Sequence, residues 1–152
     1  MDPSRMTSDL TDHLGYWLRL VSNAVSNGFA RRLQAKDVTV AEWVLLRLLL
    51  AGKGQPSALA REMGMTKGAI SKLSDRLEAR GLVARQSDPQ DGRAQVLRLT
   101  EAGAALVPLL AAMADTNDTE FFAVLSEDER ATLRALIEKM AERHGLTETP
   151  VD

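Results

Sequence analysis

Residues 65–77, in the middle of the chain, carry side chains of the kind that bind nucleic acids. At helical period the apolar residues Ile70, Leu73 and Leu77 form one stripe. The rest of this helix would present short polar and cationic groups, namely Lys67, Gly68, Ser71 and Lys72. A serine hydroxyl both donates and accepts hydrogen bonds, and lysine carries a positive charge. A helix that is buried on one side and polar and cationic on the other suits the major groove of DNA.

A second short helix is predicted immediately before this one. Residues 56–63 have helical character, with Pro56 at the first helical position, where its missing N–H costs nothing. Gly64 suits a tight turn between two helices, and Thr66 can cap the next helix by accepting from its free N–H groups. Helix, short turn and polar-faced helix together predict a helix-turn-helix.

Two strands are predicted after the second helix. Gly81 ends that helix, and Leu82–Arg85 is a short apolar run. Asp88–Arg93 is dense in turn-forming residues, and Gln95–Leu99 alternates polar and apolar residues as a half-buried strand does. Two strands joined by a charged loop form a wing, with Arg93 near its tip. The alternative is an ordinary β-hairpin with Arg93 merely solvated, but agreement among four consecutive local signals favours the wing.

Short motifs lie in and around the predicted wing. They are Leu77-Glu78-x-Arg80-Gly81-Leu82-Val83, Asp88-Pro89, Asp91-x-Arg93-Ala94 and Leu99-Thr100-Glu101-x-Gly103. Together they resemble the signature of the MarR family of bacterial transcription regulators, and the similarity spans roughly residues 8–143. The resemblance implies a mainly α fold with a small β-wing, flanked by N- and C-terminal helices that intertwine in a homodimer. It also implies a repressor that binds an inverted-repeat operator and is released by a small organic anion.

The predicted DNA-binding residues divide into two groups. Those expected to face base edges are Lys67, Gly68, Ser71 and Lys72. Those expected at phosphates or in the adjacent minor groove are Thr66, Arg76 and Arg93. Asp75 lies on the same face and either accepts from a cytosine amino group or, as we favour, holds a wing arginine in place. The alternative function is a protein–protein adaptor, which would need an apolar patch that this helix lacks.

The family resemblance also suggests a ligand site. Regulators of this kind often bind small aromatic or phenolic anions in a cleft between the dimer helices and the DNA-binding lobe. In this chain the residues that could supply an aromatic wall and an anion partner are His13, Trp17, Asn23, Trp43 and Arg47. The alternative is that both tryptophans are core aromatics and Arg47 is a surface cation.

Composition excludes several other classes. Hydrophobic residues make up 45% of the 152 residues and aromatics only 4%, which favours helices packed through aliphatic side chains. Cysteine is absent, so there is no disulfide, thiolate metal site or cysteine redox switch. The two histidines lie near opposite ends of the chain, and no catalytic constellation or phosphate loop is present. We therefore expect neither an enzyme nor a bound metal or cofactor.

Charge is distributed unevenly along the chain. Residues 53–100 carry nine basic and five acidic groups, a net charge of +4, whereas residues 101–152 carry four basic and eleven acidic groups, a net charge of −7. A duplex would attract the first segment and repel the second. No apolar run reaches membrane-spanning length and no signal-peptide pattern is present, so we expect a cytoplasmic location.

Long helices are predicted on both sides of the wing. The first runs from about Ser8 to Gln34 and would be roughly 40 Å long, more than a compact winged helix can cover. A second copy of the chain is the simplest cover for its apolar surface. Capping boxes at Thr39–Glu42 and Ser126–Glu129 open two further helices, and Thr100 caps another that runs to about Val124. We expect a dimerisation helix in residues 1–36, the DNA-binding lobe in 37–100 and dimerisation helices in 101–152.

Overall fold

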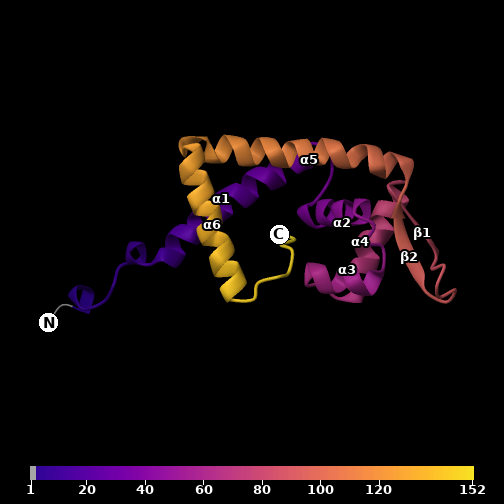
Figure 1. The fold of residues 1–152 in the computed structure, drawn as a ribbon, viewed down its shortest axis with the longest axis horizontal. Helices are drawn as coiled ribbons and strands as arrows, with labels where there is room; N and C mark the ends of the chain where they lie inside the picture. Colours follow the sequence, from indigo (N-terminus) through magenta and orange to yellow (C-terminus); the bar gives the residue numbers. More distant parts are fainter. Residues whose placement is uncertain (1–2) are drawn as a thin grey trace.

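The structure is a computed structural model that describes residues 3–152, so residues 1 and 2 of the predicted segment 1–36 lie outside it. Its elements are α1 Leu14–Gln34, α2 Val40–Leu50, α3 Pro56–Met63, α4 Lys67–Ala79, β1 Val83–Ser87, β2 Gln95–Leu99, α5 Glu101–Phe121 and α6 Glu127–Arg143. Short 3₁₀ turns occur at Pro3–Arg5, Leu10–Asp12 and Phe122–Val124. The lobe of α2, α3, α4 and the hairpin lies at one end, α5 runs above it, and α6 descends from the far end of α5 (Figure 1). This mainly helical fold with one antiparallel hairpin confirms the predicted fold class.

The core lies in the winged lobe and is built from aliphatic side chains. Its largest fully buried residues come from five helices and are Leu33, Leu45, Leu46, Leu59, Ile70, Leu77 and Leu110. The helix α2 is apolar on several sides and contacts α1, α3, α4, α5 and β2 in this core. Leu33 of α1 and Leu110 of α5 belong to the same core. The flanking helices α1 and α5 are therefore packed with the lobe as one unit.

The predicted helix caps at Thr39, Thr66, Thr100 and Ser126 and the turn at Gly64 are confirmed. At α2 the Thr39 hydroxyl accepts from the Glu42 N–H at 3.1 Å, and the Glu42 carboxylate accepts from the Thr39 N–H at 3.0 Å. Gly64 ends α3 with φ of 61°, a left-handed conformation that a side chain would strain. Ser126 and Glu129 form the same reciprocal pair at α6, and the Ser126 backbone N–H lowers the pKa of the Glu129 carboxyl.

The hairpin is joined tightly to the start of α5. The strands pair in antiparallel register from Val83 opposite Leu99 to Ser87 opposite Gln95. The Thr100 hydroxyl donates to the Gly81 carbonyl at 2.6 Å and accepts from the Gly103 N–H at 3.1 Å. A Cβ on Gly103 would collide with a backbone carbonyl of the preceding segment. The motif Leu99-Thr100-Glu101-x-Gly103 therefore has a structural role, which is to join the hairpin to α5.

The predicted first helix is wrong at its N-terminal end. It begins at Leu14 rather than Ser8, and its 21 residues span about 30 Å. His13 is extended and interrupts the helical path after the 3₁₀ turn. The Trp17 indole N–H donates to the Thr11 carbonyl at 3.0 Å, which stabilises the break by using a carbonyl that helix formation would have paired. Smaller differences occur elsewhere. The first strand is Val83–Ser87 instead of Leu82–Arg85, and α5 ends at Phe121.

The helix α6 packs little against its own chain. None of its residues is buried, and Leu136 and Ile137 are 53% and 45% exposed. The first half of α1 is similarly uncovered, with Trp17 48% and Leu20 51% exposed. Within residues 3–152, none of the helices is long and apolar enough to cross a membrane.

Candidate nucleic-acid interface

The two sides of α4 have different environments. Ile70, Leu73 and Leu77 are buried, and Ser74 joins them because its hydroxyl donates to the Ile70 carbonyl at 2.7 Å. The residues predicted to face DNA on this helix and at its N-cap are all exposed; they are Thr66, Lys67, Gly68, Ser71, Lys72 and Arg76. The structure therefore brings these six residues together on one accessible surface, as expected from the helical period.

The N-terminus of α4 adds backbone donors to this surface. The Thr66 hydroxyl accepts from the Ala69 N–H at 3.1 Å, but the other N–H groups of the first turn lack intrahelical partners. These groups and the helix dipole favour a negative charge at this end. Lys67 begins the helix there, so cationic and backbone donors lie close to each other.

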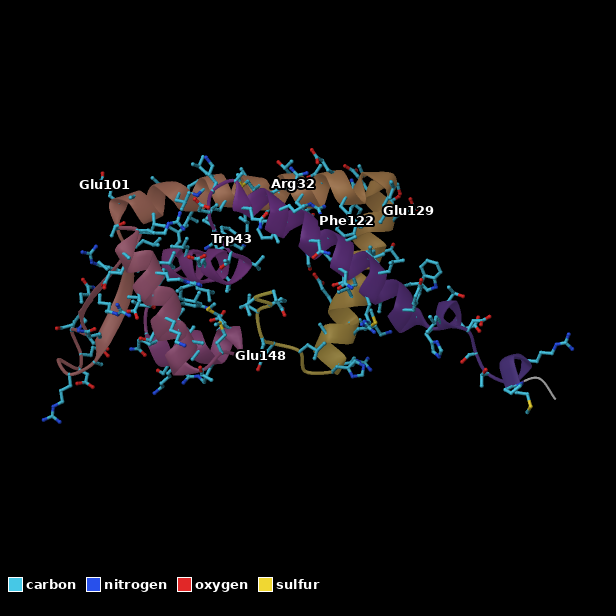
Figure 2. All side chains as sticks on the ribbon, turned by 180° about the vertical axis from the view of Figure 1, so that it is seen from behind. Arg32, Trp43, Glu101, Phe122, Glu129 and Glu148 are labelled. Carbon is cyan, nitrogen blue, oxygen red and sulfur yellow. The ribbon has the colours of Figure 1, made fainter. Side chains whose placement is uncertain are left out.

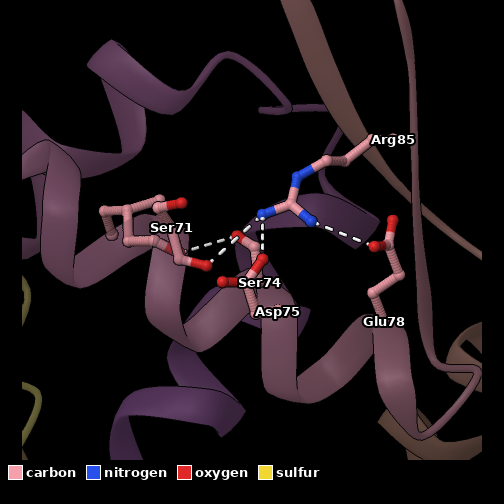
Figure 3. Close-up of polar contacts among 6 residues, drawn as sticks. Ser71, Ser74, Asp75, Glu78 and Arg85 are labelled. Atoms are coloured by element: carbon pink, nitrogen blue, oxygen red, sulfur yellow. Dashed lines mark hydrogen bonds and ion pairs between the residues drawn. The ribbon is translucent and has the colours of Figure 1, made fainter.

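Arg85 of β1 connects the wing to α4 (Figure 3). One terminal nitrogen donates to Asp75 Oδ1 at 2.8 Å and to the Ser71 carbonyl at 3.3 Å. The other donates to Glu78 Oε1 at 3.0 Å. The preferred reading of Asp75, that it holds a wing arginine, is confirmed. Arg85 itself was not among the predicted site residues, because nothing in its own segment indicates that its partners lie on the helix.

The wing loop is folded by its own aspartates. The Gln90 N–H donates to Asp88 Oδ1 at 2.9 Å and the Arg93 N–H donates to Asp91 Oδ1 at 3.1 Å. The Asp88 N–H donates to the Ala94 carbonyl at 2.9 Å and closes the loop. Such aspartate turns are the reason for the dense turn residues of the sequence. Arg93 is exposed in this loop.

A second arginine that sequence reasoning missed supports the other end of α4. Arg80 donates to the Asp37 carbonyl at 2.6 Å and to the Lys36 carbonyl at 3.2 Å, both in the loop between α1 and α2. It also lies 4.0 Å from the buried carboxylate of Glu42. The motif around Gly81 contains Arg80, but the two carbonyls to which it donates are more than forty residues away in the sequence.

The five predicted ligand-site residues are not all brought together. Trp43 packs edge-on against Phe29, with ring centroids 6.3 Å apart. Trp17 packs against Tyr16 instead, and it lies about 18 Å along α1 from Phe29. His13 and Asn23 are exposed on or beside the first half of α1, whereas Arg47 is exposed on α2 one turn after Trp43. Within one chain the two tryptophans therefore do not form a common wall.

Comparisons with known proteins agree with this geometry. A family model described as MarR family matches residues 36–94. The chain is 30% identical over 145 residues to a putative transcriptional regulatory protein for the hcr operon of Thauera aromatica, covering 94% of this chain and 86% of that protein. A mutant of MarR from E. coli complexed with operator DNA has a TM-score of 0.75 at 28% identity, covering 88% of this chain and 99% of that one. The PcaV transcriptional regulator from Streptomyces coelicolor, in complex with its natural ligand, has a TM-score of 0.70 at 28% identity over 90% of this chain and 96% of that one.

The contact between Arg85 and Asp75 gives a testable prediction. We expect Arg85→Ala and Asp75→Ala to destabilise the fold non-additively, with a coupling energy of about 0.5–1 kcal/mol, because each removes the same partly shielded ion pair. Urea unfolding of the parent, both single variants and the double variant measures this energy. Arg98→Ala is the matched control, since Arg98 lies on β2 and within residues 3–152 its guanidinium donates only to the carbonyl of the neighbouring Leu99. Additive effects of Arg85→Ala and Asp75→Ala would show that the ion pair between these residues does not stabilise the fold.

Proposed function

The chain belongs to the MarR family of transcriptional regulators, and from that premise we propose that it is a homodimeric repressor that binds a specific inverted-repeat operator in double-stranded DNA. The observation that carries this proposal is the exposure of the polar and cationic side of α4 while its apolar side is buried. Its relatives are transcriptional regulators rather than enzymes. As a regulator of transcription it would act in the cytoplasm.

Each contact with DNA would have a different role. Lys67, Gly68, Ser71 and Lys72 would lie at base edges in the major groove. The N-cap residue Thr66, with the free N–H groups beside it, and Arg76 at the flank of the helix would contact phosphates. Arg93 in the wing loop would reach the adjacent minor groove. Because Arg85 fixes the hairpin to α4, the helix and wing would approach the duplex as one rigid surface.

The terminal helices would form the dimer interface. Residues 1–36 and 101–152 contain the uncovered apolar positions of α1 and α6, whereas residues 37–100 would form the DNA-binding lobe. An amphipathic helix with no fully buried residue in its own chain needs a partner to remove its apolar face from water. A second copy of the same chain presents the same faces and can bury both.

An adaptor that binds proteins is the alternative function. It would use an apolar surface on the lobe, but α4 presents lysines, serine and glycine. The discriminating measurement is binding to a random-sequence duplex across a salt series. A DNA-binding protein loses affinity as salt rises, because counterions are released from the phosphates, and an adaptor shows no such binding.

Release by a small aromatic or phenolic anion is a further part of the proposal. Trp43 and Arg47 lie one turn apart on α2 and combine a half-buried aromatic ring with an exposed guanidinium. His13, Trp17 and Asn23 could contribute only if another chain brings the first half of α1 close to such a site. A ligand releases DNA only if it binds more tightly to the arrangement that cannot bind the operator.

We expect Lys72→Ala and Arg93→Ala to weaken DNA binding in different ways. Losing Lys72 should cost about 1–3 kcal/mol on the preferred site and relax sequence preference at one position in each half-site. Losing Arg93 should weaken binding to all sequences more evenly and lower the magnitude of the salt slope by about one or two units per dimer. Binding to specific and scrambled duplexes across a salt series measures both effects.

Lys139→Ala is the control for these two variants, because it removes a cation from α6, away from the proposed DNA-binding surface of α4 and the wing. If all three variants bound like the parent, α4 and the wing would not carry recognition. The half-sites recovered with the parent should be inverted repeats about one helical turn apart, roughly 34–36 Å.

We expect the parent chain to be a dimer that Ile137→Asp dissociates. The substitution places a charge on the apolar side of α6, whereas Ala135→Asp places the same charge on its opposite side and should leave the dimer intact. Sedimentation equilibrium measures the mass of each. A well-folded monomeric parent, or equal behaviour of the two variants, would refute the assignment of α6 to the interface.

We expect an aromatic carboxylate such as benzoate or a hydroxybenzoate to raise the melting temperature of the parent and to weaken its operator binding. Arg47→Ala should remove both effects, because the carboxylate loses its cationic partner. Thermal-shift screening followed by DNA competition tests this. Binding that leaves operator affinity unchanged would exclude a role in release.

A further inference from the structure

After α6 the chain turns back toward the winged lobe. Gly145 has φ of 63°, and the following residues run to α3 (Figure 1). The Thr149 N–H donates to the Glu62 carbonyl at 2.8 Å, at the end of α3. Val151 is half-buried and packs against the core of the lobe. Residues 144–152, the C-terminal tail, are therefore attached to the lobe by a backbone hydrogen bond and an apolar contact.

The tail places a carboxylate against the turn of the helix-turn-helix. Glu148 lies on the tail where it approaches α3 (Figure 2), and a Cβ built on Gly64 would lie only 2.5 Å from Glu148 Oε2. This carboxylate forms one side of a shallow depression beside the turn. The other residues around the depression are Ser57, Ala60, Arg61, Gly64, Met65 and Lys67.

The surroundings of Glu148 are cationic. Arg61 and Lys67 line the same depression, and the N-terminus of α4 begins beside it. Neither cation forms an ion pair within 4.0 Å with Glu148 among residues 3–152. Both are therefore attracted to the carboxylate without being fully neutralised by it, and they keep their capacity to attract another anion.

We propose that the C-terminal tail is an internal competitor of the DNA backbone, in which the Glu148 carboxylate occupies the edge of the surface that a phosphate would approach. The inference rests on the proposed DNA binding by α4. A phosphate near Lys67 would be repelled by Glu148, so the duplex must either displace the tail or bind with a weaker electrostatic gain. Because phosphates are the same in every sequence, this cost applies equally to specific and random duplexes.

Competition with phosphate also requires that the tail stays attached to α3. The hydrogen bond from Thr149 to Glu62 holds the preceding residue beside Gly64. Thr149→Pro removes that donor and should free the tail without changing its charge. Its effect on DNA binding should then depend on whether residue 148 is charged.

The experiment compares Glu148→Gln with Glu127→Gln, which makes the same change in net charge at the distant start of α6. Binding of the full chain to a random-sequence duplex is measured across a salt series. We expect Glu148→Gln to bind roughly two- to fivefold more tightly than Glu127→Gln at low salt, because a single exposed charge contact is being removed. The advantage should shrink as salt screens it. Thr149→Pro should also tighten binding, but it should add nothing in the Glu148→Gln background.

The outcomes separate this proposal from the function on which it rests. If the parent and every variant fail to bind any duplex, the DNA-binding function itself is wrong. If the parent binds with a normal salt slope but Glu148→Gln and Glu127→Gln behave alike, the competitor is refuted while the function stands. A gain in Glu148→Gln that does not change with salt would also refute it, because competition for phosphate must be screened.

Discussion

Burial of one side of α4 is the constraint on which the rest of the structure depends. Ile70, Leu73 and Leu77 can leave water only if other elements cover them, and that cover comes from α3, β1 and α2. Leu33 of α1 and Leu110 of α5 belong to the same buried cluster. The lobe that carries the candidate interface is therefore not independent of the helices that flank it. Because this cluster is closely packed, a rearrangement of α1 or α5 that displaces Leu33 or Leu110 would disturb the packing of the lobe.

The opposite side of α4 must remain available, and this creates an electrostatic problem. Asp75 and Glu78 lie near the polar side of the helix and would repel a polyanion. Arg85 pairs with both, so the same side chain that fixes the wing also reduces their negative field. The positive charge of this surface then comes from Lys67, Lys72 and Arg76, which take no part in these ion pairs.

Local signals in the sequence predicted much of this arrangement, because their partners are three or four residues away. The caps at Thr39, Thr66 and Ser126 are of this kind, as is the turn at Gly64. The break before Leu14 was missed because it depends on a tryptophan that bonds to a carbonyl six residues earlier. Arg80 and the C-terminal tail were missed because their partners are brought close only by the complete fold. The proposed ligand residues were grouped by chemical type alone. In the fold, Trp17 lies near the start of α1, whereas Trp43 packs beside Phe29 in the second half of α1.

One edge of the hairpin is protected from pairing with strands of other chains. A two-stranded ribbon has two edges, and an unprotected edge is a template on which strands of other chains can add. The Leu97 N–H, which points away from β1, donates to the Gly54 carbonyl at 2.8 Å, and a side chain on Gly54 would prevent this close approach. Arg85 ties the other strand to α4. Because the Leu97 N–H is occupied by the Gly54 carbonyl, it cannot pair with a strand of another chain, which removes one free backbone donor from the edge of the wing.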